Sequence, residues 1–121
     1  MNDTKEADYN LEERTARFGE QAISFTRKIR LDPVTKPLVS QFVRSATSVG
    51  ANYCEANGAS SKKDFKNKIH ICKKEAQETK HWLRMLATAS VETKEDSIKL
   101  WKECQELTLI FGKIVSSLKN S

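Results

Sequence analysis

Basic side chains recur between residues 62 and 84 at spacings of three and four residues. In an α-helix this spacing places them on one face, where they form a polar ridge over about 30 Å. The segment 62–89 holds eight cationic and three acidic residues, an excess of five that equals the net charge of +5 of the whole chain. We call this row the basic ridge, and its members are Lys62, Lys66, His70, Lys73, Gln77, Lys80 and Arg84.

The basic ridge has two interpretations. Cationic side chains in a row can contact successive phosphates of a nucleic acid, and such binding would be salt-sensitive and weakly sequence-specific. Alternatively, the lysines form a solvated face that keeps a helical protein soluble. Most aromatic residues fall at apolar helix positions, so base-specific readout of RNA is not supported. The residues that we predict to contact nucleic acid are Lys62, Lys66, Lys73, Lys80 and Arg84.

A second polar row lies between residues 41 and 55. Such a row more often forms a hydrogen-bonded structural network with the next helix, or with a neighbouring subunit, than a ligand site. Gly50 lies beside it, and a glycine inside a helix costs about 1 kcal/mol unless close packing requires it. The predicted network consists of Arg44, Ser48, Asn52, Glu55, Glu75 and Glu78.

Motifs for catalysis or metal binding are weak in this sequence. Glu78 and His81 have the Glu-x-x-His spacing of carboxylate-bridged di-metal bundles, but such bundles need two of these motifs and this chain has one. His70 is too far from His81 along a helix to share an ion with it. No glycine-rich phosphate loop, nucleophile elbow or Cys-His pair is present. We therefore predict a non-enzymatic protein without cofactor or metal ion, and a di-metal oxidase or carrier is the third hypothesis.

Four amphipathic segments must position these residues. Asn10 and Ser61 are each followed three residues later by an acidic residue, which is the spacing of a helix N-terminal cap. Pro37 suits a first helical turn, and Gly58 suits a helix end. Short linkers between similar helices predict an all-α, antiparallel up-down-up-down four-helix bundle over residues 10–121, preceded by a mobile tail at 1–9. The predicted helices span about 11–31, 37–57, 62–89 and 94–118.

The composition agrees with one helical domain. The chain has 121 residues, of which only four are glycine and two proline. It shows no secretory signal and no uncharged apolar run of bilayer-spanning length, so we expect a cytoplasmic protein without membrane contact. Its three cysteines, Cys54, Cys72 and Cys104, lack Cys-x-x-Cys spacing, so we expect reduced thiols in or near the core.

The last two predicted helices carry more apolar residues than one core stripe requires. Surplus apolar surface usually marks an interface, although in a bundle it can also cover a neighbouring helix. Tryptophan is the residue type most enriched at interface hot spots, so Trp82 and Trp101 are the predicted anchors of a homo-oligomer interface.

The run from Arg44 to Ala56, RSATSVGANYCEA, is followed by Gly58, Ser61 and Asp64-Phe65. This stretch resembles the four-helix-bundle proteins encoded in intervening sequences of bacterial 23S ribosomal RNA genes, which are related to the accessory protein of diversity-generating retroelements. The similarity continues through Lys74–Thr79 and covers roughly residues 11–118 in helix pattern. Where the family often has Ile-Ala, this chain has Tyr53-Cys54, which implies different fine packing.

The resemblance implies a ring-shaped homo-pentamer, with a basic surface proposed to bind nucleic acid. The leading hypothesis is therefore an oligomeric, ribosomal-RNA-associated scaffold that binds RNA through the basic ridge. The alternative is a protein-docking adaptor for a partner such as a reverse transcriptase, in which the basic surface steers association without direct RNA readout.

Overall fold

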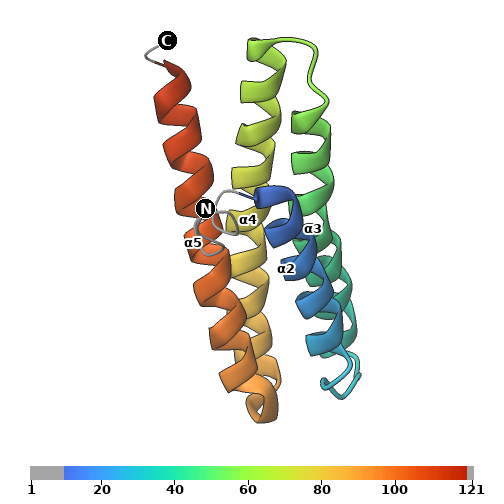
Figure 1. The fold of residues 1–121 in the computed structure, drawn as a ribbon. Coiled ribbons are helices and arrows are strands. Elements are labelled where there is room, and N and C mark those ends of the chain that lie inside the picture. The colour runs from blue at the N-terminus through green and yellow to red at the C-terminus, as the bar shows by residue number, and fades with distance from the viewer. Residues whose placement is uncertain (1–9, 120–121) are drawn as a thin grey trace.

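The computed structural model describes residues 10–119, which form four α-helices and one short 3₁₀ helix (Figure 1). The chain reverses direction at each connection, and no strand occurs within this range. The predicted all-α four-helix bundle is confirmed, whereas the predicted tail at residues 1–9 lies outside the described residues. The elements are α2 (Leu11–Thr26), α3 (Thr35–Asn57), α4 (Lys62–Ala89), η1 (Val91–Thr93) and α5 (Lys94–Lys119).

Side-chain caps begin α2 and α4 where the sequence predicts them. The Glu13 backbone N–H donates to Asn10 Oδ1 at 3.1 Å, and the Asp64 backbone N–H donates to Ser61 Oγ at 3.0 Å. These bonds satisfy N–H groups that have no partner inside the first helical turn. The predicted start and end of α4, 62 and 89, are therefore correct.

The connection between α2 and α3 differs from the prediction at both ends. After Thr26 the backbone N–H groups of residues 27–29 bond to carbonyls three residues earlier, so the α-helix tightens into a turn and ends before residue 31. Helix α3 begins at Thr35, two residues before Pro37, because Asp32 Oδ1 accepts the N–H groups of Val34 and Thr35 at 2.8 Å each. These hydrogen bonds, the one from Thr35 most of all, lower the pKa of Asp32.

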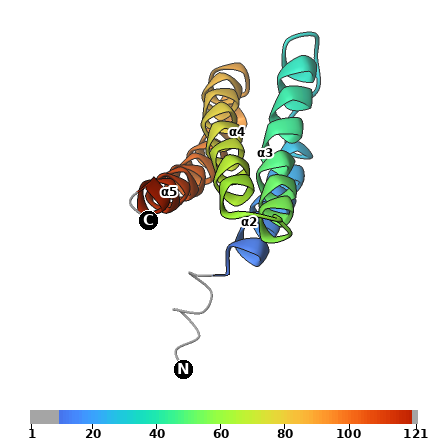
Figure 2. The same cartoon turned by 90° about the horizontal axis from the view of Figure 1, so that it is seen from above.

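Helix α4 lies between α3 and α5, and Figure 2 shows its two neighbours on either side. The core is continuous across the helices, as the edge-to-face pair of Phe25 and Phe42 shows, with ring centroids 5.7 Å apart. Most apolar positions that recur every three or four residues along the helices are buried, whereas Leu38, Tyr53, Phe65 and Ile114 are partly buried and pack against the core. The largest side chains that are less than 2% exposed include Phe18, Phe42, Phe111, Ile69, Leu83, Leu86 and Leu107.

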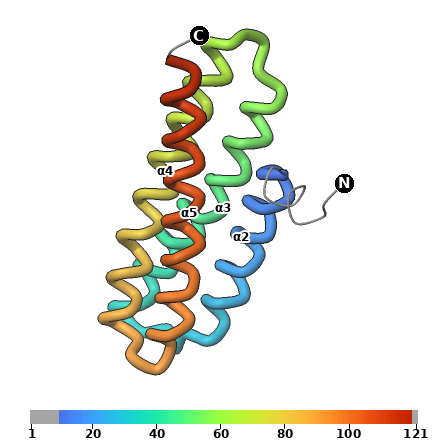
Figure 3. Tube along the Cα trace, turned by 60° about the vertical axis from the view of Figure 1, so that its left-hand side comes forward, coloured from blue at the N-terminus to red at the C-terminus, as the bar shows by residue number. Residues whose placement is uncertain are grey.

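Helix α2 is the shortest of the four helices, with 16 residues against 28 in α4. It accompanies only part of the length of α3, and it touches α5 much less than it touches α3 (Figures 1 and 3). A bidentate ion pair bridges this open seam, because Arg14 Nε and Nη2 each donate to a carboxylate oxygen of Glu103 at 2.8 Å. The hydrogen bond with the Glu103 carboxylate raises the pKa of Arg14. Glu106 approaches the same guanidinium at 3.3 Å.

Gly50 lies at a close contact between α2 and α3. A Cβ atom at this position would lie 3.3 Å from the carbonyl oxygen of Thr15, which is tighter than most Cβ contacts in proteins. The glycine that the sequence placed in mid-helix is therefore explained by close packing, as expected.

The cysteines occupy two kinds of environment. Cys72 and Cys104 are buried beside backbone carbonyls, and burial raises the pKa of each thiol to about 12. The expectation of thiols in or near the core therefore holds for these two, whereas Cys54 is exposed on the surface. None of the helices described is long and apolar enough to cross a membrane.

Candidate nucleic-acid interface

Packing of α4 against both neighbours fixes the direction of the basic ridge. The buried stripe of α4 includes Ile69, Cys72, Ala76 and Leu83, and the ridge residues follow these by one position. Lys80 Nζ donates to Gln105 Oε1 of α5. The ridge therefore turns toward α5 and away from α3.

A groove of about 510 Å³ runs between α4 and α5 at this side. We call it the α4–α5 groove. Three lysines line it and no carboxylate does, so its cations are not neutralised by acidic side chains within the groove. Phosphate groups favour such a surface because each contact releases condensed counterions. Its lining residues are Lys73, Gln77, Lys80, Gln105, Thr108, Leu109, Gly112, Lys113 and Ser116.

The structure brings only part of the predicted nucleic-acid set into this groove. Lys73 and Lys80 line it, whereas Lys62, Lys66 and Arg84 lie elsewhere along α4 and are not among its lining residues. Lys62 and Arg84 are exposed, and Lys66 is half-buried. These three positions extend the basic face beyond the groove.

Sequence reasoning missed the contribution of α5. Lys113 and Gln105 line the groove, but no residue of their helix was predicted to contact nucleic acid. The sequence does contain an indication of this α5 face, namely a row of small and polar residues at spacings of three and four that includes Gln105, Gly112 and Ser116. That spacing gives a face of one helix, and only the structure shows that Gly112 lies against the Lys73 side chain.

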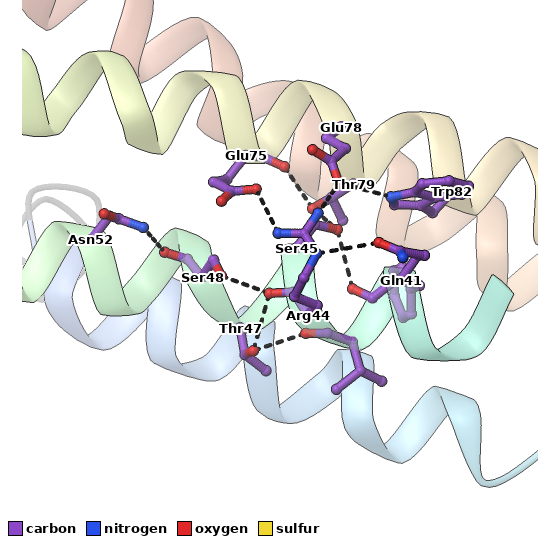
Figure 4. A network of polar contacts seen from close by, with 12 residues as sticks. Gln41, Arg44, Ser45, Thr47, Ser48, Asn52, Glu75, Glu78, Thr79 and Trp82 are labelled. Carbon is purple, nitrogen blue, oxygen red and sulfur yellow. Dashed lines mark hydrogen bonds and ion pairs between the residues drawn. The ribbon is translucent and has the colours of Figure 1, made fainter. Parts of the chain in front are cut away.

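A polar cluster occupies the opposite flank of α4, where it meets α3 (Figure 4). The Arg44 guanidinium pairs with Glu78 and, at 3.4 Å, with Glu75. Gln41 Oε1 accepts from Arg44 Nε at 3.3 Å, and Trp82 Nε1 donates to Glu78 Oε2 at 3.1 Å. One arginine thus links three polar partners across the two helices.

The other predicted members of the network bond elsewhere. Ser48 and Asn52 donate to the backbone carbonyls of Arg44 and Ser48, one turn earlier in their own helix. Glu55 forms a separate ion pair with Lys68 at 2.8 Å, and this hydrogen bond raises the pKa of Lys68. The six predicted residues therefore form two ion-pair clusters and a row of intrahelical bonds rather than one network.

Comparisons with known proteins identify the chain at the level of its family. The family model described as "23S rRNA-intervening sequence protein" matches residues 7–113. The chain belongs to this family. A search of curated proteins finds no match for this 23S rRNA-intervening sequence protein.

A solved structure shares the fold of this family member. It is the crystal structure of a protein of unknown function from the S23 ribosomal protein family of Bacteroides thetaiotaomicron. The match has a TM-score of 0.74 and 28% sequence identity, and it covers 87% of this chain and 97% of that chain. The bundle of this 23S rRNA-intervening sequence protein is thus shared over most of its length.

The two tryptophans of this family member lie on different flanks of α4. Trp82 is half-buried, packs against the core and belongs to the Arg44 cluster beside α3. Trp101 is 39% exposed on α5, and Lys80 Nζ lies 5.5 Å from the centroid of its ring. Trp82 and Trp101 therefore do not belong to one surface patch.

Both residues of the Glu-x-x-His motif in this family member contact other side chains. Glu78 pairs with Arg44, and the His81 ring packs edge-on against Trp82 with centroids 5.0 Å apart. Within residues 10–119, no group of three or more His, Cys, Asp or Glu side chains is placed to hold a metal ion.

Proposed function

We propose that this 23S rRNA-intervening sequence protein is a cytoplasmic, non-enzymatic helical scaffold that binds RNA and self-associates. One observation carries the RNA part of the proposal: three lysines line the α4–α5 groove without a carboxylate among its lining residues. Such a surface attracts phosphates without reading base sequence. Lys62, Lys66 and Arg84 extend it along α4.

Charge placement supports binding at the groove rather than a uniformly solvated face. On the α3 flank of α4, the cations Arg44 and Lys68 are paired with glutamates. On the α5 flank, Lys73 and Lys113 form no ion pair within residues 10–119. Cations on the α5 flank are therefore left without an acidic partner, which favours an anionic ligand there.

A matched pair of double variants tests the proposal. K73E/K113E reverses two charges in the groove, and K36E/K94E reverses two exposed charges at the beginnings of α3 and α5. Both variants change the net charge by the same amount. In filter binding or anisotropy titrations with a structured RNA fragment, we expect the groove variant to lose at least tenfold in affinity and the control variant to lose less than threefold. Equal losses would refute binding at the groove.

Self-association is proposed through the α3–α4 flank. Ile71 is 37% exposed, and Trp82, three turns further along the same face of α4, is half-buried. Family resemblance points to a ring of five copies. Sedimentation should show a species several times the 13.8 kDa mass of one chain, and W82A should shift it toward the monomer. A wild-type monomer at micromolar concentration would contradict this part.

The second candidate is a protein-docking adaptor, for example for a reverse transcriptase. Exposed apolar side chains at Ile98 and Leu109 of α5 favour it, because apolar residues on a charged surface often mark protein contacts. Co-purification of one protein partner that survives nuclease treatment, together with no measurable RNA affinity, would favour this role over RNA binding.

A further inference from the structure

Among the Phe, Tyr and Trp side chains between residues 10 and 119, Trp101 is the only exposed one. Phenylalanines, Tyr53 and Trp82 in this range are buried or half-buried. Lys80 lies over the Trp101 ring, and the same ammonium group donates to Gln105 at the end of the α4–α5 groove. An exposed indole is thus held beside the cations that the proposed function assigns to phosphates.

Trp101 lies beside the groove, next to its lining residue Lys80, and a second exposed apolar side chain lies within the groove. Leu109 is 61% exposed and lines the groove two turns further along α5, about 12 Å from Trp101 by helical rise. Lys113 follows Leu109 by one turn, and Lys73 lies opposite Gly112 on α4. Two exposed apolar side chains and three lysines are therefore found in and beside the groove between these two helices.

This combination matches the chemistry of a single strand better than that of a duplex. A single strand presents both its phosphates and the flat faces of its bases, and bases stack on aromatic side chains regardless of sequence. A duplex buries its base faces in its own stack, so it would contact the lysines and leave the indole unused. A second copy docked by two-fold symmetry would place the same lysines against one another, which like-charge repulsion disfavours.

We propose that the α4–α5 groove selects unpaired RNA, with a base stacked on Trp101 and the backbone held by Lys73, Lys80 and Lys113. The inference rests on the proposed RNA-binding function and adds its substrate class. It assigns to Trp101 a role in RNA binding in place of the oligomer contact expected from the sequence.

The test uses Trp101 as its own reporter. In the full chain carrying W82F, Trp101 is the remaining tryptophan. We expect its emission to be quenched when a 12-nucleotide oligouridylate is added, and to change little with a 12-base-pair RNA duplex. Unchanged emission at saturating oligouridylate would overturn the stacking contact.

Affinities of the wild type and three variants complete the test. W101L should weaken binding of the single strand by about tenfold and change duplex binding by less than twofold, whereas W101F should keep most of the single-strand affinity. If K73E/K113E lowers RNA affinity but W101L does not, the inference fails and the proposed function stands. If the wild type binds neither RNA, both fail. If W101L instead dissociates the assembly in sedimentation, Trp101 is an oligomer contact and the inference is overturned.

Discussion

The ion pair of Arg14 with Glu103 is the principal polar link between α2 and α5. Both hydrogen bonds are 2.8 Å long, and the side chains are 19% and 28% exposed. Exposed ion pairs contribute about 0–1 kcal/mol to stability, and hydrogen bonds to charged groups about 1.5–3 kcal/mol. The contribution of this partly buried, bidentate pair should exceed that of an exposed ion pair and fall within the range for hydrogen bonds to charged groups. We therefore expect R14M to lower the free energy of unfolding by about 2 kcal/mol.

The loss includes a penalty on the partner carboxylate. Without Arg14, Glu103 keeps its partly buried position and lies near Glu106, so two negative charges share a site without a cation between them. For a domain of this size, about 2 kcal/mol corresponds to a fall in Tm of roughly 8 °C. A double-mutant cycle of R14M and E103M should give a coupling energy of about 1.5 kcal/mol.

Arg17 provides a matched control on the same helix. It pairs with Glu13 at 3.7 Å within α2, and both side chains are about 60% exposed. R17M should therefore change stability by less than about 0.5 kcal/mol. Urea unfolding followed by circular dichroism measures all four variants. Equal effects of R14M and R17M, or a coupling energy near zero, would show that apolar packing alone holds α2 against α5.

Three further predictions concern local features of the fold. In thermal unfolding, G112A should raise stability by up to about 1 kcal/mol through helix propensity, whereas G50A should fall short of this gain because its Cβ meets the Thr15 carbonyl at 3.3 Å. An aromatic disulfide reagent at neutral pH should modify Cys54 rapidly and the two buried cysteines only after unfolding, and fast modification of all three would contradict the burial. The pKa of Asp32 is lowered in the folded state, so the stabilising effect of its carboxylate is present above its ordinary pKa and is lost as pH falls through the folded value. The wild type should therefore lose stability relative to D32N below roughly pH 4. Parallel pH profiles of the two proteins would refute this.

Local signals in the sequence predicted the bundle and most of its helix ends. Asn10 and Ser61 cap α2 and α4 because their side chains reach N–H groups within three residues, a distance at which sequence spacing determines geometry. The start of α3 was placed at Pro37 because proline is common in a first helical turn. In the structure, Asp32, five residues earlier, accepts the backbone N–H groups of Val34 and Thr35, and the helix begins at Thr35. When two residues each indicate a helix start, the hydrogen bonds of the complete turn decide where the helix begins.

Contacts between helices were less predictable than the helices themselves. Periodicity showed that Lys73 and Lys80 share a face of α4, but not that this face meets Gln105 and Lys113 of α5. The register between two helices depends on how the whole core packs, and no pattern within one helix encodes it. For the same reason the sequence could not show that Trp82 belongs to the Arg44 cluster beside α3 while Trp101 lies next to Lys80.

The dependence of RNA affinity on salt tests the central proposal most directly. For a single strand, the slope of log K against log salt is about −0.7 for each phosphate neutralised. K73E/K113E removes two of the proposed contacts, so its slope should be shallower than that of the wild type by about 1.4, while K36E/K94E should keep the wild-type slope. The same slope for the wild type and K73E/K113E would contradict RNA binding in the α4–α5 groove.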